Sequence, residues 1–392
     1  MKVLFLYHDF PGLGGIESVT LLLANFLSDK NNSISIISAN ANTQCDISGV
    51  SKKIKLILTP EPKKLNSTEN QKFIINYIRD NKIDFIINQG CASKIKSSDL
   101  PSDCKLIQTL HGLPFWEIRS VPYIVSWEDV LKAPVLKKLS TFKKFLFNNI
   151  HPNRKYKRVY KDYKYYIENC DCFVTLCDGY SNILKSKFPE YASRFKAIEN
   201  PIVNKSQEDI TKEKEVVFIG RLHKADKRVD RILKIWSKIE NNNNEWKLRI
   251  VGDGLEYNNL TRLAQKLLLK RCIFQGYEQN PSIFQKKAKI IILTSNYEGL
   301  PMALLESMQV GTVPVAYNCS EGMELLIDNG KNGFLIPCFK QKEFENKLLE
   351  LMNNESLWSN MSKQAIVKAQ EFDIQIIGEK WIHLFDSMTT SK

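Results

Sequence analysis

The stretch NYEGLPMALLESMQVG, residues 296–311, places Glu298 and Glu306 on either side of a Gly-Leu-Pro sequence. The apolar run IIILTS (290–295) precedes this stretch, and TVPVAY (312–317) follows it. Continuous apolar runs of this kind are typical of parallel strands that are buried on both faces. Because proline is favoured in a first helical turn and glycine just beyond a last one, the stretch predicts a short helix between two such strands.

The same alternation of strand-like and helix-like segments extends over both halves of the chain. In the first half, apolar runs lie at 2–8, 33–38, 54–58, 83–88, 105–111 and 172–177. In the second half, they lie at 216–220, 247–252, 272–276, 290–295 and 312–317. Helical spacing fills gaps at 16–28, 69–81, 228–239, 257–269, 302–310 and 341–353. Each half therefore predicts an α/β domain built on a parallel sheet that helices cover.

The boundary between the two halves is expected in the polar, aperiodic segment 200–215. We expect a Rossmann-like N-terminal domain over 1–202, a similar C-terminal domain over 203–373, and a helical segment at 374–392. Ligands of such sheets bind beyond the carboxyl ends of the strands. The expected pocket is therefore a central cleft that both domains face.

Charge and composition indicate what kind of partner the protein binds and in which cellular compartment it lies. The net charge is +13, and residues 1–205 account for +11 of it. This half is expected to meet an anion, which could be nucleic acid, a phospholipid headgroup or a phosphorylated substrate. No apolar run approaches the length of about 18 residues that a transmembrane helix needs, and the apolar N-terminus fits a first strand better than a signal peptide. The nine cysteines are scattered, as is typical of buried residues in a reducing cytosol.

The two glutamates of the opening stretch fall on different predicted elements. Glu298 lies in the loop after a strand, and Glu306 lies inside the helix that follows. The start of that helix offers unbonded N–H groups and a positive dipole end, which suit a phosphate. A carboxylate can accept hydrogen bonds from the two vicinal hydroxyls of a sugar. The alternative is a surface helix that carries two solvated acids.

Cations follow another predicted strand in FIGRLHKADKRVDRIL, residues 218–233. Arg221 comes directly after the strand and Lys227 comes just before the next helix. Two cations at this edge of a sheet can clamp a diphosphate and neutralise the charge that develops on it. The alternative is an ordinary basic loop.

Two further segments follow strands of the first half. GLGGIES (12–18) is a glycine-rich turn that leads into a helix, so a phosphate or sugar could approach its backbone closely. Glu17 breaks the G-x-G-x-x-G pattern, which disfavours a nicotinamide cofactor. In QTLHGLPFW (108–116), His111 closes a strand and could hydrogen-bond a sugar, or it could be a structural histidine.

Together these motifs resemble those of retaining glycosyltransferases of family 4, which have the GT-B fold. The resemblance rests on Gly14-Gly15, on Arg221 with Lys227, and on Glu298-x7-Glu306 followed by GTVPVAYN. The segments ENPI (199–202) and EGMELLIDNGKNGFLI (321–336) also match in position. The resemblance is most specific over 216–337 and weak between 113 and 170. The last helical segment, near 374–388, would cross back onto the first domain, as in the family.

The resemblance implies a role for each matching position. The donor diphosphate would lie against Arg221 and Lys227. The nucleotide ribose would bind Glu306, the transferred sugar would contact Glu298, and His111 would line the sugar site. Further donor contacts would come from Gly14, Gly15, Gly220, Tyr277 and the backbone N–H groups of Met302 and Ala303.

Two departures from the family pattern concern the identity of the donor. The chain has Leu-Pro-Met at 300–302, where the family often has a small residue and glycine. It has Glu-Gly-Met at 321–323 in place of the usual Gly-Pro. No Asp-x-Asp metal motif is present, so we expect no metal or other cofactor.

The segment 132–164 is unusually basic and aromatic. It holds eleven Lys and Arg residues against one acid, Asp162, with Phe and Tyr interleaved. This composition suits an anionic membrane surface, single-stranded nucleic acid, or a solvated helical face over an aromatic stripe. Because the implied acceptor is often lipid-linked, we favour a cytoplasmic protein that lies peripherally on the inner face of the cell membrane, and expect no nucleic acid.

The sequence thus predicts a hexosyltransferase. It would move a sugar from a nucleotide-diphosphate donor, expected to be a UDP-sugar, to a saccharide acceptor in polysaccharide or lipopolysaccharide synthesis. Retention at the anomeric carbon follows from the resemblance alone. The alternatives are a soluble sugar-phosphate acceptor, or a non-catalytic protein that binds nucleotide-sugar or nucleic acid.

Overall fold

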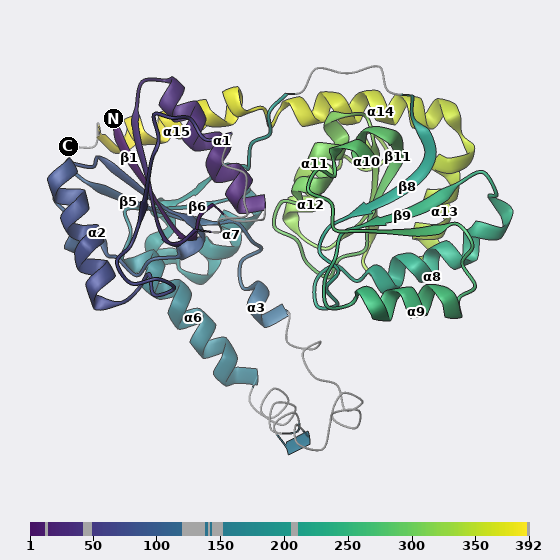
Figure 1. Cartoon of the computed structure of the whole chain (residues 1–392), viewed down its shortest axis with the longest axis horizontal. Helices are drawn as coiled ribbons and strands as arrows, with labels where there is room; N and C mark the ends of the chain where they lie inside the picture. Colours follow the sequence, from purple (N-terminus) through teal and green to yellow (C-terminus); the bar gives the residue numbers. More distant parts are fainter. Residues whose placement is uncertain are drawn as a thin grey trace. The chain divides into compact units, whose positions relative to one another are not determined.

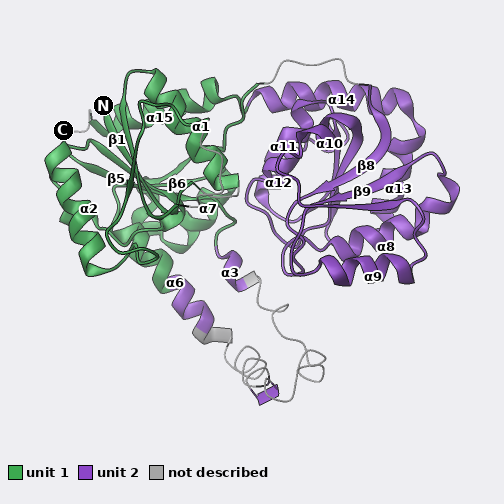
Figure 2. Cartoon of the chain, viewed as in Figure 1, with its two compact units in different colours: residues 1–114, 161–204, 372–392 green, residues 115–160, 205–371 purple. Residues whose placement is uncertain are grey.

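The computed structural model describes residues 1–11, 15–41, 49–119, 138–139, 142, 152–204 and 211–389. The chain divides into two compact units (Figure 2). The N-terminal unit comprises Met1–Pro114, Lys161–Asn204 and Phe372–Lys392, and the C-terminal unit comprises Phe115–Tyr160 and Lys205–Glu371. Each unit is described by itself below.

The described part of the N-terminal unit contains a seven-stranded sheet in the order β3-β2-β1-β4-β5-β6-β7. Every neighbouring pair in this sheet is parallel. The strands are β1 (Lys2–Asp9), β2 (Ser33–Asn40), β3 (Lys55–Leu58), β4 (Phe85–Asn88), β5 (Lys105–Leu110), β6 (Cys172–Thr175) and β7 (Phe195–Ala197). The order steps outward from β1 in both directions, as in other doubly wound sheets.

Helices connect most of these strands (Figure 1). The apolar core on the sheet includes side chains of the first and the last helix. The α-helices are α1 (Gly15–Asp29), α2 (Thr68–Asn81), α6 (Pro152–Glu168), α7 (Asp178–Lys187) and α15 (Ile374–Thr389), and the short 3-10 helices are η1 (Gln89–Cys91), η2 (Ser97–Asp99) and η4 (Pro189–Arg194). Helix α2 begins after Ser67, whose side chain accepts a hydrogen bond from the N–H of Asn70. Such a cap satisfies one N–H of the first turn.

Helix α15 follows the C-terminal unit in sequence but packs in the N-terminal unit, beside α1 (Figure 1). The rings of Phe85 on β4 and Phe385 on α15 have centroids 4.5 Å apart. Gly378 lies directly against the ring of Phe26, where a Cβ atom would collide with it. The last helix is therefore part of the N-terminal core rather than an appendage.

The C-terminal unit contains a six-stranded parallel sheet in the order β10-β9-β8-β11-β12-β13. The strands are β8 (Glu213–Ile219), β9 (Lys247–Val251), β10 (Cys272–Gly276), β11 (Ala288–Leu293), β12 (Val313–Asn318) and β13 (Phe334–Pro337). Strands β8 and β11 are neighbours, although β9 and β10 lie between them in sequence. Their carboxyl ends therefore meet at the centre of one edge of the sheet.

Helices alternate with these strands as expected for an α/β unit. They are α3 (Trp116–Arg119), α8 (Val229–Ile239), α9 (Tyr257–Lys266), α10 (Ser282–Lys287), α11 (Met302–Gln309), α12 (Glu321–Leu326), α13 (Gln341–Asn353), α14 (Glu355–Gln370) and the 3-10 helix η5 (Glu240–Asn242). Helix α8 buries Ile232, Leu233 and Trp236 against the unit, which explains the helical spacing of its apolar residues.

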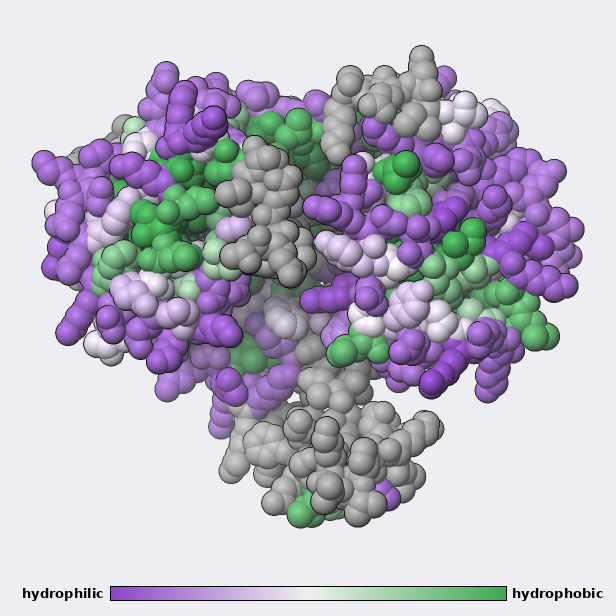
Figure 3. Space-filling model, viewed as in Figure 1, coloured by the Kyte–Doolittle hydropathy of each residue, from purple (hydrophilic) through white to green (hydrophobic). Residues whose placement is uncertain are grey.

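The structure confirms the predicted class, two Rossmann-like α/β units with parallel sheets, and the predicted helix between β11 and β12. The sequence patterns did not predict strands β7 and β13 or helices that include α7, α10, α12 and α14. Strand β7 has three residues and β13 has four, which is too short for a clear pattern. In the described residues, no helix is both long and apolar enough to cross a membrane. Hydrophilic residues predominate on the visible surface (Figure 3).

Candidate functional site

The loops after β8 and β11 bring a lysine and a glutamate together in the C-terminal unit. The Nζ atom of Lys227 donates hydrogen bonds to both carboxylate oxygens of Glu298, at 2.8 and 2.9 Å. The hydroxyl of Ser295 donates to Oε1 of Glu298 at 2.6 Å. The side chains of Lys227 and Glu298 are only 19% and 8% exposed. Two residues predicted separately thus form one buried ion pair.

A polar network that the sequence did not reveal ties the two loops together. Asn296 donates its backbone N–H to the carbonyl of Asp226 and its side-chain amide to the carbonyl of Ala225, at 2.7 and 2.8 Å. Arg231 on α8 donates to the carbonyl of Thr294 at 2.9 Å and to Oδ1 of Asn296 at 2.8 Å. These bonds fix the two loops on which Lys227 and Glu298 lie.

Arg221 differs from Lys227 in its exposure. Its guanidinium lies 3.3 Å from Oδ2 of Asp226, and its side chain is 71% exposed. The imidazole Nδ1 of His223 lies 2.6 Å from the other carboxylate oxygen of Asp226. Arg221 therefore presents a solvated cation at the edge of the sheet, next to the buried pair.

Close backbone contact at the ends of β8 and β9 restricts two positions to glycine. Gly220 has a φ of 153°, and its N–H donates to the carbonyl of Val251 at 3.0 Å. Gly252 has a φ of 134°, and a Cβ atom there would collide with the carbonyl oxygen of Gly220. Gly220 thus fixes the start of the loop that carries Arg221, and its contact with a donor stays a prediction.

Helix α11 begins four residues after Glu298 and carries the second glutamate. The N–H of Leu304 donates back to the carbonyl of Pro301, at 3.0 Å. The N–H groups of Met302 and Ala303 precede it in the first turn, where helix geometry offers no helical acceptor. Glu306 is half-buried and accepts a hydrogen bond from Nε2 of Gln285, at 3.0 Å.

Two aromatic residues lie close to these loops, and a third lies at the sheet edge. The rings of Trp116 and Tyr297 stack with centroids 5.7 Å apart. Burial raises the pKa of Tyr297 to about 12, so its hydroxyl stays protonated at neutral pH. Tyr277, which was predicted to contact the donor, follows edge strand β10 and is 58% exposed.

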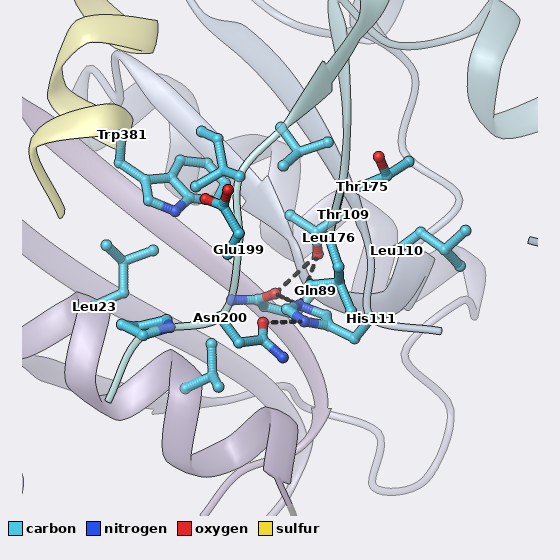
Figure 4. A pocket seen from close by; sticks show the side chains of 14 residues that line it. Leu23, Gln89, Thr109, Leu110, His111, Thr175, Leu176, Glu199, Asn200 and Trp381 are labelled. Atoms are coloured by element: carbon cyan, nitrogen blue, oxygen red, sulfur yellow. Dashed lines mark hydrogen bonds between the residues drawn. The ribbon is translucent and has the colours of Figure 1, made fainter. Parts of the chain in front are cut away.

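The N-terminal unit gathers neutral polar groups around His111 (Figure 4). Nε2 of His111 lies 2.6 Å from Oε1 of Gln89 and 3.2 Å from the hydroxyl of Thr109. Nδ1 lies 3.1 Å from the side-chain amide of Asn200. These residues come from the ends of β4, β5 and the segment after β7, and they line one small pocket with Trp381.

Burial lowers the pKa of His111 to about 4. The imidazole is therefore neutral at physiological pH, and it can offer one donor and one acceptor. Asn200 belongs to the ENPI segment, but its contact with His111 was not predicted. Such a contact depends on strand order, which the spacing of residues in the sequence does not reveal.

The remaining predictions concern the glycine-rich turn, the basic segment and the absence of a metal. Gly15 is exposed at the first residue of α1, whereas Gly14 lies outside the described residues. Most of the basic segment 132–164 also lies outside them. Its described part in α6 exposes Lys157, Arg158, Lys161 and Lys164. Among the described residues, no group of three or more His, Cys, Asp or Glu side chains could hold a metal ion.

A known family of proteins is similar in sequence to the C-terminal unit. Residues 201–368 match the model of the family described as glycosyl transferases group 1. An uncharacterized glycosyltransferase of Haemophilus influenzae is 30% identical over 216 residues, which are 55% of this chain and 61% of that protein. The chain thus spans less than two thirds of the length of this relative.

A further relative and a solved structure extend the comparison. The GalNAc-alpha-(1->4)-GalNAc-alpha-(1->3)-diNAcBac-PP-undecaprenol alpha-1,4-N-acetyl-D-galactosaminyltransferase of Campylobacter jejuni is 29% identical over 216 residues, covering 53% of this chain and 60% of that protein. The crystal structure of Anabaena Alr3699/HepE in complex with UDP-glucose aligns with a TM-score of 0.69 at 16% identity, covering 99% of this chain and all of that one.

The two parallel-sheet units have the GT-B fold, and residues 201–368 are similar to the family of glycosyl transferases group 1. The fold is the one that the resemblance of the sequence motifs implied, and the family match covers the segment 216–337 where that resemblance is most specific.

Proposed function

We propose that the protein is a glycosyltransferase of cell-surface polysaccharide synthesis, which moves a sugar from a nucleotide-diphosphate donor to a hydroxyl of a saccharide. The observation that carries the proposal is the buried pair of Lys227 and Glu298 beside the exposed guanidinium of Arg221. The family match over 201–368 and the positions of these residues on its motifs support it.

The donor diphosphate would bind where the sheet edge is most cationic. Arg221 and Lys227 would contact its oxygens, and the first N–H groups of α11 would receive a phosphate or the sugar. As the anomeric bond breaks, negative charge grows on the leaving diphosphate. A fixed and poorly solvated cation such as Lys227 stabilises such charge strongly. Glu298, which is held by Lys227 and Ser295, would contact hydroxyls of the transferred sugar.

We further propose a UDP-sugar as donor and retention at the anomeric carbon. The UDP-glucose in the Anabaena structure supports the first point by fold alone. For retention, the leaving phosphate would accept the proton of the attacking hydroxyl on the face from which it departs. Neutral His111 would hydrogen-bond the sugar rather than act as a base.

No metal ion is part of the proposed mechanism, because the two cations would neutralise the diphosphate. Chelation with EDTA, followed by transfer or donor hydrolysis assays, is expected to leave the rate unchanged. Loss of activity that Mg²⁺ or Mn²⁺ restores would contradict this point.

The acceptor is proposed to be a lipid-linked saccharide at the cytoplasmic face of the membrane. The name of the Campylobacter relative, which describes a polyprenyl-diphosphate-linked acceptor, supports this choice. The exposed basic face of α6 would contribute about 1 kcal/mol per cation near an anionic surface. Flotation with phosphatidylglycerol vesicles should recover the wild-type protein, and changing Lys157, Arg158, Lys161 and Lys164 to Gln should reduce recovery. Equal recovery would contradict membrane contact through α6.

The function is tested by incubating the purified protein with a panel of UDP-sugars and detecting UDP and glycosylated products by mass spectrometry. Turnover of at least one donor is expected, with hydrolysis when no acceptor is present. If no donor is consumed and the protein instead binds RNA with a steep salt dependence, the chain is a binding protein and the proposal is wrong. Transfer to a free sugar phosphate would place the acceptor in solution.

A further inference from the structure

Gln285 on α10 is a buried residue that contacts the glutamate of α11. Its side chain is 3% exposed. Its Nε2 atom donates to Oε2 of Glu306 at 3.0 Å and lies 3.4 Å from the carbonyl oxygen of Ala303, one turn earlier on α11. The amide therefore contacts both the side chain and the backbone of the helix that carries Glu306.

Hydrogen bonds to its backbone carbonyl fix the position of Gln285. Its backbone carbonyl accepts hydrogen bonds from Nζ of Lys212 at 3.2 Å and from the hydroxyl of Thr312 at 2.5 Å. Lys212 also donates to the hydroxyl of Thr312 at 2.6 Å. These three residues close a ring of hydrogen bonds between α10 and the residues that directly precede β8 and β12. The ring restrains the end of α10 from which the amide projects.

The two glutamates of the opening motif are held by different chemistry. Glu298 is neutralised by an ammonium group, whereas the contact of Glu306 with Gln285 involves a neutral amide. An amide donor fixes the plane of a carboxylate without cancelling its charge. A charged carboxylate forms hydrogen bonds to hydroxyls that are about twice as strong as those of a neutral acceptor. The contact with Gln285 thus orients the Glu306 carboxylate without itself neutralising it.

We propose that Gln285 is a positioning residue, which orients the Glu306 carboxylate to accept hydrogen bonds from the two vicinal hydroxyls of the donor ribose. The inference rests on the proposed function. It assigns the recognition of ribose to the pair of residues and not to Glu306 alone. The expected consequence is a preference for ribonucleotides over deoxyribonucleotides that depends on Gln285.

The test is equilibrium binding of UDP and 2′-deoxy-UDP to the full chain, measured by calorimetry. Gln285→Met keeps the length of the side chain and removes the amide. We expect this variant to bind UDP about tenfold more weakly, while its affinity for 2′-deoxy-UDP changes little, so that the preference for ribose falls. Gln285→Glu places a second carboxylate next to Glu306 and should weaken UDP binding further.

A matched control is available on α13, where Nε2 of Gln341 donates to Oε1 of Glu345 at 2.9 Å. Gln341→Met removes the same kind of bond away from the site and should leave both affinities unchanged. Thermal unfolding of each variant shows whether the protein is still folded. A general loss of structure would weaken the binding of UDP and of 2′-deoxy-UDP equally, whereas a loss of orientation at Glu306 would weaken UDP binding alone.

The outcomes distinguish a failure of the proposed role of Gln285 from a failure of the proposed donor site. If Glu306→Gln abolishes the preference for ribose and folded Gln285→Met and Gln285→Glu retain it, the role of Gln285 is overturned and the donor site stands. If the wild-type protein binds no UDP, or if Glu306→Gln retains the preference, the proposed ribose contact fails and the inference fails with it.

Discussion

The side-chain clusters described at the carboxyl edges of the two sheets differ in charge. In the C-terminal unit, the edge carries charged side chains arranged in pairs: Lys227 with Glu298, and Arg221 with Asp226. In the N-terminal unit, His111 and its hydrogen-bond partners are neutral, because burial keeps the imidazole unprotonated and the partners are amides and a hydroxyl. Glu199, the one acid among the described residues that line this pocket, is paired with Lys380.

This difference in charge implies that the two edges bind different chemical groups. A diphosphate needs cations, and the cost of desolvating them is lower where a carboxylate already balances one of them. Neutral donors and acceptors suit sugar hydroxyls, which carry no charge. Two units of similar topology are thus specialised by the side chains at one edge, and the following variants test that specialisation.

The largest effect is expected from Lys227→Ala. Removing the ammonium takes away a contact to the leaving diphosphate, so turnover should fall about 100- to 1,000-fold. It also leaves the Glu298 carboxylate buried without its counter-ion, which should cost about 3–5 kcal/mol of stability. Urea denaturation and donor hydrolysis measure the two effects. The double variant Lys227→Met, Glu298→Gln should recover stability but not activity, and recovery of both would contradict the diphosphate contact.

A smaller and more selective effect is expected from Arg221→Ala. Because the guanidinium is 71% exposed, its loss should change the free energy of unfolding by no more than about 0.5 kcal/mol. Donor turnover should still fall about 10- to 100-fold, since a charged hydrogen bond to the diphosphate is removed. A drop in stability as large as that of Lys227→Ala would show that the two cations do not differ as described.

At neutral pH the smallest effect is expected in the N-terminal unit, where the contribution of His111 to stability changes only in acid. The folded-state pKa of His111, about 4, lies below its ordinary value of 6.5, so the unfolded chain binds the proton more readily. The stabilisation is complete above pH 6.5 and is lost as the pH falls toward 4, by at most about 3 kcal/mol. His111→Gln should flatten this acid limb in denaturation curves at pH 7 and pH 4.5. An unchanged slope would contradict a buried, neutral imidazole.

The sequence predicted the elements and the charged residues but not their contacts. Apolar runs located most strands because a buried parallel strand is apolar throughout. The motif positions of Lys227 and Glu298 were found, but their pairing depends on β8 and β11 being neighbours, which no local pattern contains. Asn296, Arg231 and Gln285 were missed for the same reason, since each is an unremarkable polar residue in sequence. Asn200 was quoted within ENPI, yet its partner His111 lies 89 residues earlier.

The place of α15 in the N-terminal core has a consequence for synthesis. Phe26 and Phe85 leave the ribosome early, whereas Gly378 and Phe385, which pack against them, are made after the whole C-terminal unit. At roughly 5–20 residues per second, the interval between residues 204 and 389 lasts about 10 to 40 s. The N-terminal unit is therefore completed only after the C-terminal unit has been made, and the apolar residues that α15 covers lack that cover during the interval.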